Sequence, residues 1–261
     1  MIKPLKLAGF ATLALSLFAT ALQAKTIERS FDVGDGGLLK LETSVGALRI
    51  DTHSASTVLV EVEIDGKNED RMKVSFDNSG NNVTIIGERE ESGGGFWGSN
   101  RLKVKYHITV PKNYNLDVDT AGGSIKISDL VGKVDAHTSG GSITLGRIDG
   151  LVDINTSGGS ITVDEVTGTI RAHTSGGSVT ATISKQPTGD SKLTTSGGSI
   201  TVYLAADIAV DLSARTSGGR VRSDFDVNGS IKKKSIKGTI NGGGPELVLK
   251  TSGGSVRIKE L

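Results

Sequence analysis

The chain has 261 residues, a formal net charge of +1 with acidic and basic residues interspersed, and no cysteine. The balanced charge, with no basic stripe, argues against nucleic acid as a partner, and the lack of cysteine excludes thiol catalysis, cysteine-based zinc sites and disulfides. Glycine is abundant, at 36 residues, but it recurs at fixed positions of a repeat, which indicates ordered turns rather than disorder.

Residues 1–24 have the order of a secretory signal peptide. Two lysines precede an apolar run from Leu7 to Leu22, and Ala24 supplies a small residue before the expected cleavage site. The run is short for a membrane span, so an uncleaved anchor is the less favoured alternative, and we expect no transmembrane span after signal removal. The sequence therefore predicts an exported protein that is located in the periplasm, at the cell surface or outside the cell. It also predicts one mature domain over residues 25–261.

Residues 25–115 contain short stretches in which apolar and polar residues alternate, most clearly in Val58–Ile64. A period of two is typical of strands, and we expect wider, irregular coils of the same kind as the repeats that follow. A glycine-rich loop between these stretches carries Phe96 and Trp97, the only tryptophan. This aromatic pair could contact a partner, a sugar or a membrane surface, or it could fold back over the end of the stack.

Residues 116–261 repeat a Thr-Ser-Gly-Gly-Ser motif, and every copy is followed by isoleucine or valine. Ala121 replaces the first serine in one copy, and Arg220 replaces the last serine in another. The copies begin at Thr120, Thr138, Thr156, Thr174, Thr195, Thr216 and Thr251. The first four starts are 18 residues apart, and the later steps are 21, 21 and 35. A fixed period of this length indicates a small unit that is stacked on itself.

Alternate residues are apolar on both sides of each glycine pair, as in Ile154 before Thr156 and Ile161 after it. Each unit is therefore predicted to be a strand, a glycine turn and a second strand, with at least one turn glycine at positive φ and little room for a side chain where layers stack. The fold class that follows is all-β: a single-stranded parallel β-helix, right-handed, with about 18–21 residues per coil. A left-handed hexapeptide helix also suits the 18-residue step, but it fits the later steps poorly.

Three stretches resemble a bacterial family of unknown function, numbered 4097, whose β-strand-repeat members are described as adhesins. They are Tyr106–Pro111 with Leu116–Val118, the run of Thr-Ser-Gly-Gly-Ser copies, and the closing segment from Gly238 to Ile258. The resemblance implies an exported β-helical protein of the cell envelope. It brings no established active site.

Two outward columns precede the glycine turns and carry the candidate site. Asp117, Asp135 and Asp153 occupy one slot of successive repeats, and His137 lies in a neighbouring slot. Stacked layers are about 4.8 Å apart, so these carboxylates would form a ladder. Such a ladder could provide acid and base groups for glycoside hydrolysis, or bind a divalent cation, or simply keep the face solvated.

A second outward slot holds a rank of threonines, which good strand propensity explains and which could also order water or contact sugar hydroxyls. Its members are Thr144, Thr162, Thr180 and Thr201. No hydrolase motif is present, and we expect no catalytic residues, cofactor or metal. The sequence favours a non-enzymatic envelope module, adhesive or structural, whose partner is an envelope component, a glycan or a protein. The alternative is a carbohydrate-active enzyme or metal-dependent sugar binder that uses the aspartate ladder.

Overall fold

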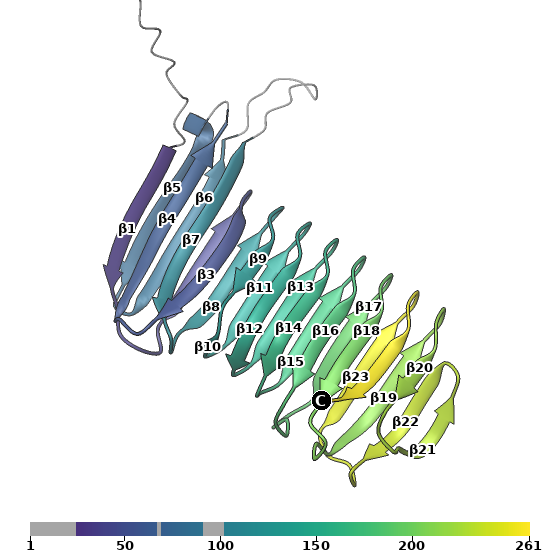
Figure 1. Ribbon diagram of the computed structural model, residues 1–261. Helices are drawn as coiled ribbons and strands as arrows, with labels where there is room; N and C mark the ends of the chain where they lie inside the picture. The colour runs from purple at the N-terminus through teal and green to yellow at the C-terminus, as the bar shows by residue number, and fades with distance from the viewer. Residues whose placement is uncertain (1–24, 67–68, 91–101) are drawn as a thin grey trace, which may run out of the picture.

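The computed structural model describes residues 25–66, 69–90 and 102–261, and it shows two long sheets packed face to face along one rod (Figure 1). Sheet A has the order β1 (Lys25–Asp32), β4 (Thr57–Asp65), β7 (Lys103–Pro111), β3 (Ala47–His53), β9 (Ile125–Ile127), β12 (Ile143–Asp149), β14 (Ile161–Val166), β16 (Val179–Ile183), β18 (Ile200–Leu204), β24 (Val256–Glu260) and β20 (Val221–Ser223), with β10 (Leu130–Val131) beside β12. Sheet B has the order β21 (Asn228–Lys232), β22 (Ser235–Ile240), β19 (Val210–Thr216), β23 (Glu246–Thr251), β17 (Ser191–Thr195), β15 (Ile170–Thr174), β13 (Val152–Thr156), β11 (Val134–Thr138), β8 (Asn115–Thr120), β2 (Leu38–Thr43), β6 (Asn82–Arg89) and β5 (Met72–Ser79). One short 3-10 helix, η1 (Glu69–Arg71), precedes β5.

The repeats form the central part of both sheets, and their strands pair in parallel. Val134 pairs with Val152, which in turn pairs with Ile170, so the neighbouring strands of this region lie 18 residues apart along the chain. The prediction of an all-β fold built from stacked parallel strands is confirmed.

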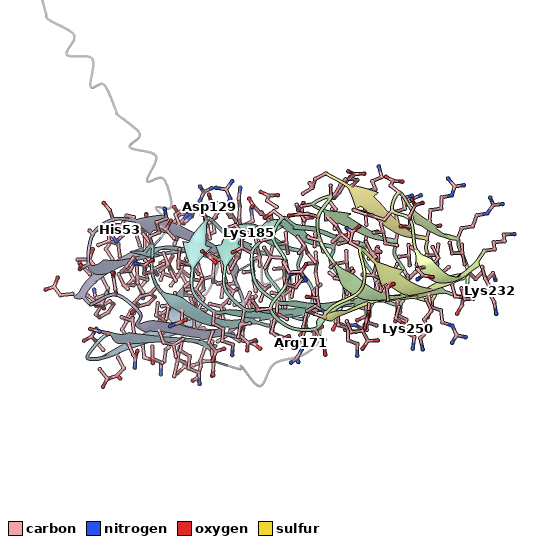
Figure 2. All side chains as sticks on the ribbon, turned by 90° about the horizontal axis from the view of Figure 1, so that it is seen from below. His53, Asp129, Arg171, Lys185, Lys232 and Lys250 are labelled. Carbon is pink, nitrogen blue, oxygen red and sulfur yellow. The ribbon has the colours of Figure 1, made fainter. Side chains whose placement is uncertain are left out.

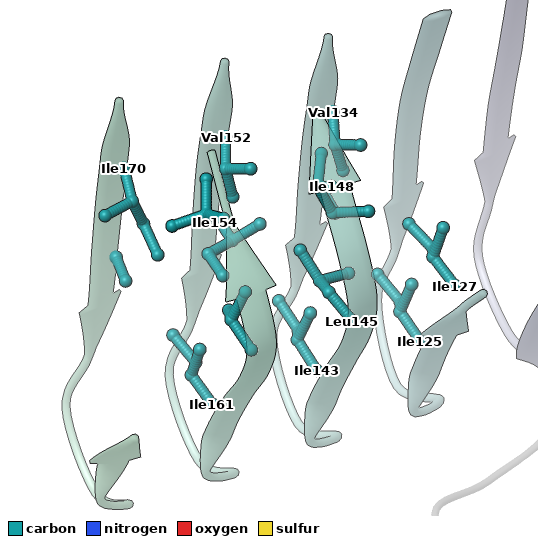
Figure 3. Close-up of a cluster of buried hydrophobic side chains, with 14 of the residues drawn as sticks. Ile125, Ile127, Val134, Ile143, Leu145, Ile148, Val152, Ile154, Ile161 and Ile170 are labelled. Atoms are coloured by element: carbon teal, nitrogen blue, oxygen red, sulfur yellow. The ribbon is translucent and has the colours of Figure 1, made fainter. Parts of the chain in front are cut away.

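The aliphatic residues of the repeats lie between the two sheets (Figure 3). Ile143, Ile161 and Ile200 have at most 1% of their surface exposed, as the alternating pattern predicts. Each buried side chain of this size contributes about 1.5–3 kcal/mol through the hydrophobic effect, and stacking joins them into one continuous core.

The motif threonine is buried and links successive layers. Thr156 is fully buried, and its Oγ1 donates to the carbonyl of Gly141 in the preceding layer at 2.7 Å, while the amide of Gly159 donates to the same Oγ1 at 3.4 Å. The same pair of bonds recurs at Thr138, Thr174 and later copies. Every buried side-chain polar atom among the described residues has a hydrogen-bond partner. Burial of the threonine hydroxyl therefore leaves no polar group unsatisfied.

The second glycine of each turn is required by close approach of the layers, not by its φ angle. A Cβ on Gly159 would lie 2.2 Å from the carbonyl oxygen of Gly141. Positive φ angles occur instead at Gly132 and Gly150, in the other turn of the coil, at 146° and 155°. The expectation of positive φ in the motif pair is therefore wrong, whereas the expectation of little space there is confirmed.

Residues 25–115 differ from the predicted coils, because they combine parallel and antiparallel pairs. β4 pairs antiparallel with both β1 and β7, and β5 pairs antiparallel with β6. Among the described strands of this part, β2, β3, β6 and β7 continue the parallel stack. The antiparallel strands widen this end of the rod (Figure 1).

The order of layers departs from chain order at both ends of the rod. β23 lies between β17 and β19, and β24 lies between β18 and β20, so the final strand pair inserts before the layer that precedes it in the sequence. Likewise, β2 lies between β8 and β6. The step of 35 residues before Thr251 is thus explained by the hairpin of β21 and β22, which the chain forms before it returns.

Candidate functional site

The aspartate column lies on the outer face of sheet B, as predicted. Asp117 pairs with Asp135, and Asp135 pairs with Asp153, in directly neighbouring strands. All three side chains are exposed or half-exposed, and Asp135 accepts a contact from Lys133 Nζ at 3.4 Å. The column continues in the next two layers with basic residues, Arg171 and Lys192.

A second column runs beside it, one residue before the motif threonine. Its members in the order of the layers are Glu42, Asp119, His137, Asn155, His173, Thr194, Lys250 and Arg215. Acidic residues therefore occupy the two layers at one end of this column, and lysine and arginine occupy the two layers at the other end. His137 and His173 are separated by the layer of Asn155 and thus by about 9–10 Å, which is too far for one metal ion.

The acidic and basic stretches of the aspartate column meet at a shallow depression of about 310 Å³ on sheet B. Its lining includes Asp153, Arg171 and Lys192, and His173, whose Nδ1 lies 2.7 Å from Thr194 Oγ1. Among the described residues, no group of three or more His, Cys, Asp or Glu side chains is placed to hold a metal ion. The carboxylates stand one layer apart on an open face, an arrangement suited to contact with an extended partner.

The basic half of the face does not follow from the repeat spacing alone. Lys250 belongs to β23 and Arg215 to β19, and these strands stack in the reverse of their chain order. A signal was nevertheless present: residues 170–261 contain 13 basic and 7 acidic residues, and residues 25–169 contain 15 basic and 22 acidic ones.

The hydroxyl rank lies on the outer face of sheet A. Thr144, Thr162, Thr180 and Thr201 pair in register through four strands and are half-buried. The neighbouring serines have a structural role, since the amide of each donates to the Oγ of the serine one layer earlier, as Ser160 does to Ser142 at 3.2 Å. The slot of the threonines continues with Lys126 at one end and with Arg257 and Arg222 at the other, so this face offers both hydroxyl and basic groups to solvent.

Charged pairs flank the threonine rank on sheet A. Arg147 Nε donates to Glu165 Oε2 at 2.5 Å, and Ser184 Oγ donates to the other carboxylate oxygen at 2.5 Å. The hydrogen bond from Ser184, followed by that from Arg147, holds the pKa of Glu165 below its ordinary value. This carboxylate is therefore committed to a structural pair.

Phe96 and Trp97, the predicted aromatic contact point, lie outside the described residues, so that hypothesis stays a prediction. Across the part of the chain that the structure describes, no helix is long and apolar enough to span a membrane. The molecule is thus defined as an all-β stack of parallel strands with two extended polar faces.

Comparison with known protein families finds a match over part of the chain. Residues 39–151 match the model of the Toastrack DUF4097 family, which confirms the resemblance found in the sequence. No curated protein matches the chain.

Several solved structures are similar to the chain over most of its length. A candidate cell adhesion protein from Clostridium sporogenes is 18% identical, with a TM-score of 0.39, and the match covers 92% of this chain and 100% of that one. A candidate adhesin from Bacteroides fragilis is 13% identical, with a TM-score of 0.44 and coverage of 91% and 97%. A candidate lipid-binding protein from Parabacteroides distasonis is 14% identical, with a TM-score of 0.29 and coverage of 90% and 96%.

Proposed function

We propose that this protein is an exported, non-enzymatic module of the bacterial cell envelope that binds a macromolecular partner through its outer sheet faces. In this proposal residues 1–24 direct export, and residues 25–261 act as one domain in the periplasm or at the cell surface. The coil is right-handed, with about 18–21 residues per turn in the repeat region. The partner is an envelope component, a glycan or a protein.

The observation that supports this proposal is the in-register polar face. Side chains such as Asp135 and Asp153 project from neighbouring strands of a rigid stack at a spacing of about 4.8 Å. A surface of this kind presents a regular row of groups to an extended partner, and it does not enclose a small substrate. Stacking holds the row in place, so binding costs little additional ordering of the protein.

The proposal is tested with purified residues 25–261 and cell fractions. We expect the protein in the periplasmic or surface fraction, and we expect it to be retained by at least one of three probes: peptidoglycan sacculi, lipopolysaccharide, or vesicles containing anionic phospholipid. Retention must be reduced by reversing the charge of an exposed residue on an outer face, as in Lys126→Glu on sheet A. A cytoplasmic location together with no retention by any probe overturns the proposal.

A second candidate is a carbohydrate-active enzyme or metal-dependent sugar binder that uses Asp117, Asp135 and Asp153. The observation that favours it is the separation of one layer between these carboxylates, close to the 5–5.5 Å used by retaining glycosidases. The variant Asp135→Asn should then abolish polysaccharide turnover or calcium-dependent binding while the circular dichroism spectrum stays unchanged. Equal activity of the variant and the parent protein rules this candidate out.

A further inference from the structure

The outer face of sheet B carries opposite charges on its two halves. On one side of the boundary between β13 and β15 the column residues are mostly acidic: Glu42, Asp117, Asp119, Asp135 and Asp153, with Lys40 paired to Glu42 at 2.8 Å. On the other side they are mostly basic: Arg171, Lys192, Lys250 and Arg215, while the acids Asp211 and Glu246 lie near the starts of β19 and β23. The four basic side chains form none of the ion pairs found among the described residues. Figure 2 shows labelled basic residues from this half, Arg171 and Lys250, pointing away from the ribbon.

The acids and bases lie at matching distances from that boundary. Counted in strands, Asp153 and Arg171 are the first on their respective sides, and Asp135 and Lys192 are the second. In the neighbouring column the third strands carry Asp119 and Lys250. The fourth strands of that column, β2 and β19, carry Glu42 and Arg215. The charges of the first three strands on each side are therefore complementary under a two-fold rotation. In the fourth layer Glu42 is already paired with Lys40 of its own strand. In the third layer Asp117 would lie opposite Val248.

We propose that the partner of this face is a second copy of the chain. The two-fold axis runs parallel to the strands, between β13 and β15, so the two rods lie antiparallel and each column faces its own copy. Asp153 then faces Arg171 of the second copy, and Asp135 faces Lys192. Asp119 faces Lys250, and each of these contacts occurs twice by symmetry, as in other two-fold dimers.

The size and chemistry of the face set the strength of this dimer. Eight strands at about 4.8 Å spacing, each about 17 Å long, give roughly 650 Å² per copy, or about 1,300 Å² in total, which lies within the range of specific interfaces. Exposed ion pairs are worth only about 0–1 kcal/mol each and are screened by salt. The dimer is therefore weak and forms at low ionic strength.

Other occupants fit this face less well. An extended polyanion would be attracted to Lys192 and Lys250 but repelled by Asp119 and Asp153 on the same face. A parallel arrangement of two rods would place like charges opposite each other. Antiparallel self-association is the arrangement that satisfies both halves at once, and it leaves the threonine rank of both sheet A faces available to the envelope partner.

This inference rests on the proposed function, because both treat the outer face of sheet B as a recognition surface. It is tested separately, by measuring the mass of the purified protein in solution. Residues 25–261 are studied by analytical ultracentrifugation at about 10 mM and about 0.5 M salt, where the Debye lengths are about 30 Å and a few ångströms. We expect twice the monomer mass at low salt and the monomer mass at high salt. A protein that stays monomeric in both conditions overturns the inference but leaves binding to envelope probes unaffected.

Two charge-reversed variants provide the decisive measurement. Asp119→Lys alone and Lys250→Asp alone each place like charges opposite one another twice, so each should be monomeric at low salt. An equimolar mixture should form a heterodimer, because the lysine introduced in the first variant faces the aspartate introduced in the second, and the remaining native pair is intact. Arg257→Glu, an exposed site on sheet A, is the matched control and should remain dimeric.

Recovery of the doubled mass in the mixture also shows that both variants are folded. The inference is wrong if either variant dimerises as the parent protein does, if the mixture remains monomeric, or if the control loses the dimer. A low-salt complex that appears only on addition of a polyanion such as heparin would likewise contradict it, because the occupant would then be the polyanion.

Discussion

Replacement of Gly141 by alanine tests the reason why the motif contains two glycines. A Cβ on Gly141 would lie 2.1 Å from the carbonyl oxygen of Gly123 and 2.5 Å from the amide nitrogen of Ser124 in the preceding layer. Neither group can move alone. The Gly123 oxygen accepts a hydrogen bond of 2.8 Å from Thr138 Oγ1, and the carbonyl of Ser124 accepts one from the amide of Leu48 in its neighbouring layer.

The cost of this substitution can be worked from two contributions. Overpacking a well-filled site costs about 1–3 kcal/mol. Displacement of the Gly123 carbonyl also breaks its bond to the fully buried Thr138 hydroxyl, which adds about 1–3 kcal/mol for a buried polar group without its partner. We therefore expect Gly141→Ala to lower the free energy of unfolding by about 4 kcal/mol, equivalent to a melting temperature lower by about 8–16 °C for a chain of this size.

The adjacent Gly140 provides the matched control. A Cβ there would meet no atom closer than 3.7 Å, and its φ does not lie in the left-handed region. Gly140→Ala should be neutral or stabilise the fold by about 0.4–1 kcal/mol, because alanine reduces the entropy of the unfolded chain. Urea unfolding of both variants, followed by circular dichroism, measures the difference. If the two variants unfold within about 0.5 kcal/mol of each other, close approach of the layers does not explain the second glycine.

Three further predictions concern buried and paired groups. Thr156→Val should cost about 1–3 kcal/mol by urea unfolding, because it removes the donor to Gly141, whereas Thr156→Ser should recover most of the loss. Burial raises the pKa of Tyr114 from 10.0 to about 12. The stability that this group contributes is fully present below pH 10 and is lost, by up to about 3 kcal/mol, as pH rises from 10 to 12. Tyr114→Phe should therefore reduce the difference in unfolding free energy between urea titrations at pH 9 and pH 11. The lowered pKa of Glu165 predicts stability that is present above its ordinary pKa and lost as pH falls through the folded value, so Glu165→Gln should flatten thermal melts recorded between about pH 6 and pH 3.

The core of the rod could be predicted from the sequence because its signal is repeated. Ile143 and Ile161 occupy the same slot of successive units, and parallel pairing in register places them together inside. Local alternation and a fixed period are sufficient for this inference. The order of layers at the ends could not be predicted, because Thr251 and Thr216 carry the same motif and either could follow Thr195 without changing any local pattern.

The candidate face was predicted on one side only for the same reason. Asp117, Asp135 and Asp153 come from consecutive repeats, so the spacing alone places them in a column. Lys250 joins the neighbouring column only because β23 inserts between β17 and β19. In the structure β22 pairs with one edge of β19 and β23 with the other, and which strand takes which edge is a tertiary property.

The columns of the rod differ in what they can reveal about function. Thr156 and Gly159 both join successive layers: the threonine through its buried hydroxyl, and the glycine through the close approach of its backbone to the preceding layer. Their repetition therefore follows from stacking alone. The outer column of sheet B has no such constraint, and it changes from Asp153 to Arg171 in a single layer. A solvated strand face would be equally soluble if all of its charges were negative or all were positive. Stacking therefore does not explain why the charge changes sign at the middle of this face, and that boundary is where the partner of this protein should be sought.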